Sequence, residues 1–205
     1  MLGVYESPCL VTERLLLRPA RHSDLPYLHH MRSDPGVAWH MGIRIPRDET
    51  VSYDYLHAMM EGVTDGDWIY WAVATKTDDC FIGSLVLWNY RRIHHDAEIG
   101  YCLAPNHQHQ GYMYEAMQAV MRYSFLRLKL RQLVVHTGTA NEASLKLLKR
   151  CSFTLASYLL QENLRGEQTA MARYTLSRSA WLKMQKINRK MSGNQAEGEL
   201  TCVLM

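Results

Sequence analysis

The chain has 205 residues, of which 47% are hydrophobic and 21% charged, a composition typical of one globular domain and not of a disordered or fibrous protein. Its formal charge of +3 is small and evenly spread, which excludes a dedicated nucleic-acid-binding protein with a concentrated basic stripe. No run approaches the roughly 18 apolar residues that a membrane-spanning helix needs, so an integral membrane protein is also excluded.

The cysteines and histidines predict neither disulfides nor a metal site. The five cysteines are odd in number and lack C-x-x-C spacing, which fits a reducing compartment. The first residues also lack the apolar core of a signal peptide, so a cytoplasmic location is expected. Two histidine pairs, His94-His95 and His107-x-His109, have no neighbouring Cys or carboxylate at a recognised ligand spacing, so no metal is expected.

The first third of the chain predicts one strand and two helices. Residues 9–18 are expected to form a strand, because three consecutive leucines are flanked by arginines and followed by a proline. A Ser-Asp N-cap begins a short helix over residues 23–32, which ends at the Asp-Pro-Gly run 34–36. A second helix is expected over residues 48–61, where apolar residues recur at helical spacing.

The rest of the chain alternates strands and helices. Aromatic and β-branched segments bounded by turn residues predict an antiparallel meander of three strands, over residues 68–75, 80–90 and 97–104. The expected elements after the loop are a helix, a strand, a helix and two strands, over residues 114–128, 132–137, 141–150, 154–162 and 168–176. This order predicts an α/β fold with one mixed sheet.

The C-terminal part differs in composition from the rest, and three regions are expected. Residues 1–177 would form the folded domain, residues 178–191 a basic helix, and residues 192–205 a flexible tail of small polar residues. The last four residues, Cys202 to Met205, fit the C-a-a-X pattern of a farnesylation site.

A strand, loop and helix unit in the middle of the chain carries the main chemical signal. The strand ends at Leu103, the loop contains Gly111, and the helix begins near Met113. Such a unit directs free backbone N–H groups and the positive end of the helix dipole to one point, where phosphate groups bind. The sequence therefore predicts a site for a phosphate-bearing ligand at this loop.

The residues of this loop also resemble a known motif. The run from Gln108 to Met113, QHQGYM, resembles the acetyl-CoA loop of the GNAT superfamily of N-acetyltransferases, Q/R-x-x-G-x-G/A. Met113 stands where the superfamily usually has a small residue. The longer run GYMYEA, however, resembles the form found in RimJ-type members, so this departure is consistent with that subfamily.

Three further segments extend the resemblance over residues 11–176. Thr12 to Arg18 (TERLLLR) is similar to the first strand of RimJ/RimL-like enzymes, and Ala97 to Tyr101 (AEIGY) to their fourth strand. Asn141 to Phe153 resembles their N-x-x-S helix, with Ser152 in the place of the usual glycine. The resemblance implies a single, mostly antiparallel sheet that is splayed between its fourth and fifth strands and flanked by helices.

The resemblance also implies acetyl-CoA as the co-substrate and assigns residues to it. The main chain of Tyr101, Cys102 and Leu103 would pair with the pantetheine arm like an added strand. Backbone N–H groups of the loop would hold the pyrophosphate. Besides these three strand residues, seven others are expected to bind acetyl-CoA. They are Gln108, Gln110, Gly111, Tyr112, Met113 and Tyr114, from the loop and the start of the following helix, and Asn141.

Acetyl transfer to an amine needs a base for the amine and a proton for the departing thiolate. Glu98, beside the expected gap, and Glu162, in a segment that resembles RimL-type enzymes, are the two candidate bases, with Glu162 slightly preferred. Ser144 is the candidate acid, with Asn141 orienting the pantetheine or a water. Two structural alternatives remain open: Asn141 caps its helix, and Glu98 forms a surface ion pair with a nearby arginine, Arg91 or Arg92.

The acceptor is expected to be a protein N-terminal α-amine of the ribosomal-protein-alanine type, bound against Trp39, His40 and Met41. The alternatives are a small amine, such as a polyamine, amino acid or antibiotic, and a non-catalytic CoA-binding or membrane-tethered module. A monomer or homodimer without direct nucleic-acid contact is expected. Membrane association would require prenylation of Cys202, for which the basic helix supplies a second signal; a chance match of four residues is the other interpretation.

Overall fold

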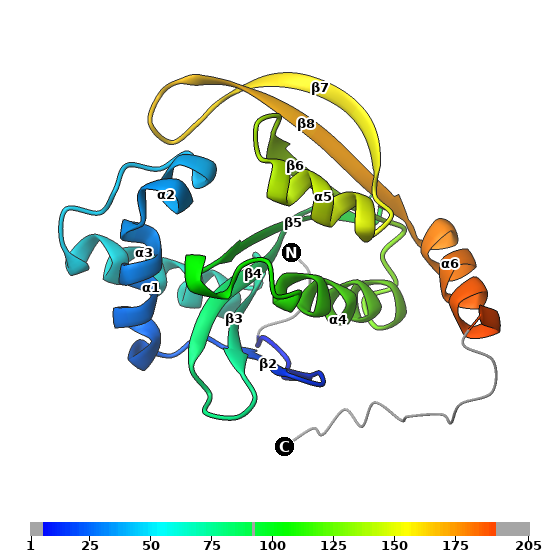
Figure 1. The fold of residues 1–205 in the computed structure, drawn as a ribbon, viewed down its shortest axis with the longest axis horizontal. Coiled ribbons are helices and arrows are strands. Elements are labelled where there is room, and N and C mark those ends of the chain that lie inside the picture. The colour runs from blue at the N-terminus through cyan, green and yellow to red at the C-terminus, as the bar shows by residue number, and fades with distance from the viewer. Residues whose placement is uncertain (1–5, 92, 192–205) are drawn as a thin grey trace.

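The computed structural model describes residues 6–91 and 93–191, which form one eight-stranded sheet flanked by helices (Figure 1). The strands are β1 (Leu10–Val11), β2 (Leu15–Pro19), β3 (Ile69–Thr75), β4 (Phe81–Arg91), β5 (Asp96–Leu103), β6 (Gln132–Gly138), β7 (Thr154–Glu162) and β8 (Gln168–Ser177). The helices are α1 (Leu25–Ser33), α2 (Pro35–Met41), α3 (Glu49–Thr64), α4 (Tyr112–Leu126), α5 (Glu142–Arg150) and α6 (Arg178–Met191).

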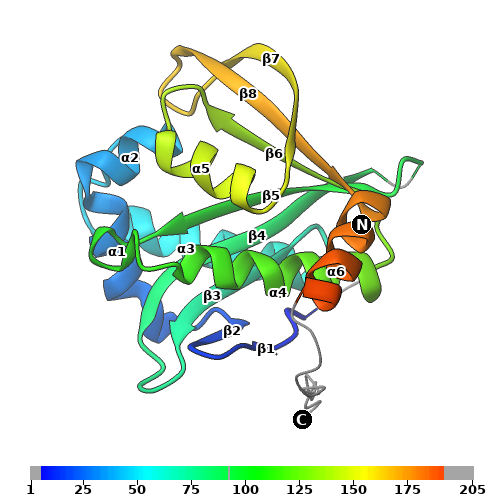
Figure 2. The same ribbon diagram turned by 45° about the vertical axis from the view of Figure 1, so that its right-hand side comes forward.

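The sheet is mixed and mostly antiparallel, as the sequence predicts. Its strand order is β1-β2-β3-β4-β5-β6-β8-β7, and β5 and β6 form the one parallel pair among the described strands. Residues that alternate along β3 face opposite layers, because successive side chains of a strand point to opposite faces. Trp71 and Val73 pack in the core beneath α4, whereas Ala72 packs with Leu28 of α1 and Leu56 of α3. Helices α4 and α5 therefore cover one face and α1 to α3 the other (Figures 1 and 2).

The parallel pairing between β5 and β6 is short. It joins Asp96, Ala97 and Glu98 to residues 132–134, and no pairing between these strands continues beyond Glu98. From there β6 stays paired with β8 on its other side as far as Gly138, while β5 stays paired with β4 as far as Leu103. The sheet is thus splayed between β5 and β6. These are the fourth and fifth strands that the resemblance indicates, because the expected first strand is divided into β1 and β2.

The predictions for the first third of the chain were wrong in two places. Residues 9–18 form a hairpin of β1 and β2 instead of one strand, because the turn is closed by Thr12, whose Oγ1 accepts a hydrogen bond from the backbone N–H of Leu15 at 2.9 Å. The run at 34–36 ends α1 but also starts α2. Asp34 Oδ1 accepts a hydrogen bond from the backbone N–H of Val37 at 2.9 Å, and the following proline suits the first helical position.

The structure shows the surroundings of the two residues that depart from the GNAT pattern, Met113 and Ser152. Met113 is buried in the first turn of α4, where its side chain packs in the core. Ser152 has a φ of 60°, in the left-handed region, which explains why glycine is usual after this helix. A non-glycine residue in that conformation costs about 1–2 kcal/mol.

The C-terminal helix α6 lies against the end of α4 (Figure 2). Trp181 is buried there, with its ring 5.3 Å from that of Phe125. The expected flexible tail and Cys202 lie outside the described residues. Within residues 6–91 and 93–191, no helix has the length and apolarity to cross a membrane, and no group of His, Cys, Asp or Glu is arranged to hold a metal ion.

A buried ion pair joins the sheet to the first helix. Nη1 and Nη2 of Arg18, near the end of β2, each donate to the carboxylate of Asp24 at 2.8 Å, and both side chains are almost completely buried. A second carboxylate, that of Asp79, accepts a hydrogen bond from Nε of Arg18. Hydrogen bonding to Asp24 raises the pKa of Arg18, so the buried guanidinium stays protonated.

We expect Asp24→Ala to lower the free energy of unfolding by about 3–5 kcal/mol, because it leaves a buried guanidinium without its bidentate acceptor. Urea denaturation would measure the change. Arg47→Ala, which removes an exposed ion pair with Asp48, is the matched control and should cost less than about 1 kcal/mol. A cost for Asp24→Ala as small as that of the control would contradict the role given to the pair.

Candidate active site

A cleft of about 910 Å³ lies where β5 and β6 separate. Its walls come from β4, β5 and β6, from α2, and from α5 and the first turn of α4. The outer half of β5, from Ile99 to Leu103, lines this cleft and has no partner from β6. A strand edge with free N–H and C=O groups can pair with an extended ligand as if the ligand were another strand.

The N-terminus of α4 forms one end of the cleft. Gly111 immediately precedes this helix with a φ of 81°, in the left-handed region that favours glycine. Among the described residues no side chain caps the helix, so its first N–H groups are available to a ligand. The side chain of Gln108 donates a hydrogen bond of 2.9 Å to the carbonyl oxygen of Leu103, which fixes the loop to the end of β5. This arrangement can hold a phosphate group.

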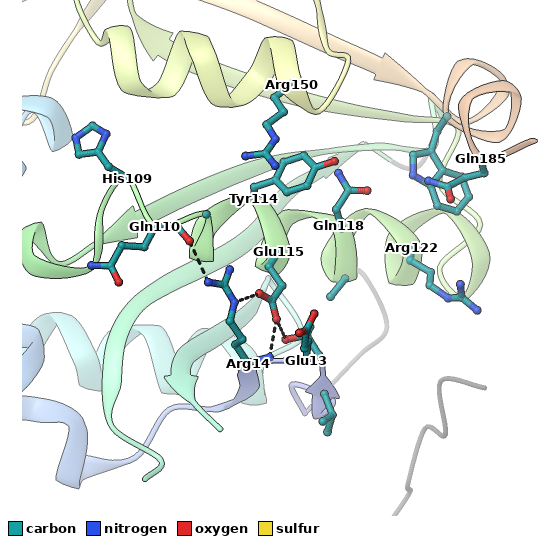
Figure 3. Close-up of a pocket in the computed structure, with 15 residues that line it drawn as sticks. Glu13, Arg14, His109, Gln110, Tyr114, Glu115, Gln118, Arg122, Arg150 and Gln185 are labelled. Carbon is teal, nitrogen blue, oxygen red and sulfur yellow. Dashed lines mark hydrogen bonds and ion pairs between the residues drawn. The ribbon is translucent and has the colours of Figure 1, made fainter. Parts of the chain in front are cut away.

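Arg14 holds the loop from outside (Figure 3). Its Nη1 donates to the carbonyl oxygen of Gln110 at 3.0 Å, and its Nε donates to the carboxylate of Glu115 at 2.7 Å. The guanidinium also lies 4.4 Å from the ring centroid of Tyr112. These contacts attach the first turn of α4 to the β1–β2 hairpin, and they give Arg14 a role that the sequence alone does not indicate.

A hydrogen-bonded pair of hydroxyls lies on the α5 side of the cleft. The hydroxyl of Tyr101, on β5, is 2.7 Å from that of Ser144, on α5, and both residues line the cleft. Asn141 caps α5, since its Oδ1 accepts a hydrogen bond from the backbone N–H of Ser144 at 3.0 Å. Burial raises the pKa of Tyr101, so its phenol carries a proton at neutral pH. The structure thus brings Asn141, Ser144 and Tyr101 together.

Glu98 does not form the ion pair with Arg91 that one interpretation of the sequence expects, because Arg91 instead donates to Asp96 at 2.9 Å. Arg92, the other expected partner, lies outside the described residues. The Glu98 carboxylate accepts from the side-chain amide of Asn89 at 2.6 Å and lies 3.2 Å from Nδ1 of His136. His136 comes from β6 and lines the cleft, yet nothing in the sequence singles it out. Its closeness to Glu98 depends on the pairing of β5 with β6.

The other candidate base, Glu162, lies elsewhere. It is exposed at the end of β7, paired with Gln168 near the tip of the β7–β8 hairpin, and it does not line the cleft. Of the residues expected to bind the acceptor, His40 and Met41 line the cleft from α2. Trp39 does not line the cleft. Its side chain is 61% exposed, and its ring centroid lies 4.4 Å from the guanidinium of Arg165, in the β7–β8 hairpin.

The two cysteines near the cleft are not suited to nucleophilic catalysis. Burial raises the pKa of the Cys102 thiol, in β5, to about 12. Burial does the same for Cys151, at the end of α5. Both thiols are therefore protonated at neutral pH, and a thiolate is the reactive form of cysteine.

A groove of about 750 Å³ continues from the cleft along the outer side of α4 (Figure 3). The cleft and the groove share four lining residues: His109, Gly111, Tyr114 and Arg150. The guanidinium of Arg150 lies 3.9 Å from the ring centroid of Tyr114, between the two hollows. Gln110 lines the groove and not the cleft, so nine of the ten expected acetyl-CoA-binding residues lie along this continuous path. The tenth, Tyr112, lines neither hollow, because its ring packs against the guanidinium of Arg14.

Comparisons with known proteins agree with this geometry. A family profile described as an acetyltransferase (GNAT) domain matches residues 14–154. The N-acetyltransferase p20 of Bacillus licheniformis, itself uncharacterized, is 31% identical over 144 residues, which are 70% of this chain and 81% of that protein.

Two solved structures share the fold. One is RimL, the ribosomal L7/L12 alpha-N-protein acetyltransferase, with a TM-score of 0.74 and 24% identity over 82% of this chain and 93% of that one. The other is spermidine N-acetyltransferase from Vibrio cholerae in complex with CoA and spermine, with a TM-score of 0.71 and 22% identity. The match covers 83% of this chain and 99% of that one. The splayed sheet, the uncapped helix after a glycine and the family match together show that the chain belongs to the GNAT family and is an acetyl-CoA-dependent N-acetyltransferase.

Proposed function

We propose that the chain transfers the acetyl group of acetyl-CoA to the α-amine at the N-terminus of a protein, in the manner of RimJ/RimL-like enzymes. The observation that carries this proposal is the charge of the cleft. Of the described residues that line it, Glu142 is the only acidic one, whereas Lys146 and Arg150 are basic. A polyamine carries several positive charges and needs several carboxylates, while an N-terminal amine carries a single charge and continues into a neutral backbone.

The shape of the cleft supports the same acceptor. Its α2 side and sheet floor are largely apolar, with Met41, Val86 and Trp88 among the lining residues. Such a surface can pack against the side chains of the first residues of a peptide. The spermidine acetyltransferase of Vibrio cholerae shares the fold, so a small amine is the second candidate acceptor.

The continuous path from the cleft to the groove supports one arrangement of bound acetyl-CoA. The pantetheine arm would pair with the free edge of β5 at Tyr101 to Leu103, next to Asn141 of α5. The pyrophosphate would meet the free N–H groups that follow Gly111. The nucleotide end would then enter the groove beside Tyr114, where the guanidinium of Arg150 can pair with a phosphate.

The hydroxyl pair would supply the proton for the departing thiolate. When the C–S bond breaks, the CoA sulfur needs one proton, and the adjacent hydroxyls of Ser144 and Tyr101 can deliver it and recover it from solvent. Side-chain alternation along β5 places Tyr101 on the same face as Ala97 and Ile99, toward α4 and α5, and Glu98 on the opposite face. The proton donor would thus act from the side of the sheet opposite Glu98.

A thiol-release assay with a panel of amines tests the acceptor. We expect CoA release with peptides that begin with Ala, Ser, Met or Thr, and at least about tenfold lower kcat/KM with spermidine, because each uncompensated charge in the cleft costs binding energy. Peptides with an acetylated N-terminus and an internal lysine are the control for side-chain amines. Turnover of spermidine without turnover of any peptide would contradict the proposal in favour of the second candidate.

We expect Gly111→Ala to weaken acetyl-CoA binding about tenfold, because the added methyl group disfavours the left-handed turn that exposes the N–H groups of α4. Calorimetric titration with acetyl-CoA measures the change. Gly166→Ala is the matched control, since Gly166 has a similar φ of 84° with open space around it, in the distant β7–β8 turn. Equal acetyl-CoA affinities for the two variants would contradict the assignment of the loop.

Ser144→Ala and Tyr101→Phe should each lower kcat by about 100-fold while acetyl-CoA binds as before. The double variant should lose little more than either single variant, because the two hydroxyls act as one unit. Steady-state kinetics would measure this. Ser124→Ala, which removes a buried hydroxyl without a described partner in α4, is the control. A kcat for Ser144→Ala like that of this control would remove the pair from the mechanism.

A further inference from the structure

Both oxygens of the Glu98 carboxylate are occupied by neighbouring side chains. Oε1 accepts the hydrogen bond from Asn89, on β4, and Oε2 lies 3.2 Å from Nδ1 of His136, on β6. The Glu98 side chain is 17% exposed, and it does not line the cleft. A carboxylate in this setting is well placed to orient another group but poorly placed to meet an incoming amine.

His136 has the complementary properties. It lines the cleft, its side chain is 22% exposed, and it lies just beyond the last paired residues of β5 and β6, where the two strands separate. An ionised carboxylate can only accept a hydrogen bond, so Nδ1 carries the proton that it shares with Glu98. Nε2 is then a free acceptor, and it has no hydrogen-bond partner among the described residues.

We propose that His136 is the catalytic base of this enzyme and that Glu98 and Asn89 are positioning residues that set its tautomer. The proposal rests on the transfer of acetyl groups to an amine, whichever amine is the acceptor. His136 lies on the face of the sheet opposite the Tyr101–Ser144 pair, since it alternates with Val135, which packs beneath α4. The acceptor amine would therefore lie between the base and the thioester carbonyl, with the proton donor on the far side of the sulfur.

The proton balance follows from this arrangement. Nε2 of His136 takes one proton from the ammonium group, and the freed lone pair forms the C–N bond with the thioester carbonyl carbon. The C–S bond then breaks, and the sulfur takes a proton from the Tyr101–Ser144 pair. The nitrogen loses its second proton to solvent, and His136 and the hydroxyl pair return to their starting states by exchange with solvent. One proton is released for each acetyl group transferred.

Other charged groups surround the imidazole and enter any pH dependence. Arg173 lies directly opposite His136 in the neighbouring strand β8, and Glu98 lies on the other side in β5. The same cleft is lined by His40 of α2 and by Glu142 and Lys146 of α5. The titration of His136 must therefore be followed at the residue itself as well as through activity.

Kinetics of His136→Gln, measured with the most active amine of the panel, is the first test. We expect kcat to fall about 100-fold, with unchanged acetyl-CoA affinity and loss of the acid limb of the pH profile of kcat/KM, because the group that takes the proton is gone. Glu98→Gln should lower kcat less and displace that limb. His30→Gln, an exposed histidine of α1, is the control. A His136→Gln enzyme with the wild-type pH profile would overturn the proposal.

The second test does not require turnover, so it separates this proposal from the choice of acceptor. Nitrogen-15 NMR of the labelled imidazoles, assigned by comparison with His136→Gln, should show His136 in the Nδ1–H tautomer at neutral pH. Glu98→Gln should shift it toward the Nε2–H form. If His136 were in the Nε2–H tautomer in the wild-type protein, or if Glu98→Gln left its tautomer unchanged, the assignment of the base would fail even with an active enzyme.

Discussion

The brief parallel pairing between β5 and β6 is the constraint on which the site depends. Three residues of each strand pair, and then the strands follow different partners, β5 with β4 and β6 with β8. A longer pairing would satisfy the backbone of both strands and leave no edge for a ligand. A shorter one would not bring Glu98 within reach of His136. The splay thus creates the cleft and also fixes the groups that surround it.

Two hydrogen-bonded pairs lie on either side of this opening, and they belong to different layers of the fold. Tyr101 and Ser144 face the layer of α4 and α5, while Glu98 and His136 face the opposite side. This separation matches the chemistry of acetyl transfer, in which one proton leaves the amine and another reaches the sulfur. Because a strand alternates its side chains, β5 can supply a member of each pair within four residues.

The phosphate end of the site depends on a different set of contacts. The N–H groups at the start of α4 are useful only if the loop holds them in place, and Arg14 does so by bridging Gln110 and Glu115. The hairpin of β1 and β2 therefore has a second role besides forming the edge of the sheet. It braces the loop through residues about one hundred positions apart in the chain.

The sequence by itself determined what is local: nearly all helices and strands, the cap of α5 at Asn141, and the glycine loop before α4, because each depends on residues a few positions apart. It missed α2, since the same Asp-Pro-Gly run can end one helix and cap the next. Only the tertiary structure decided which side chains meet. It paired Glu98 with His136 and Tyr101 with Ser144, and it left Glu162 at an exposed hairpin end, because strand pairing joins residues that no local pattern relates.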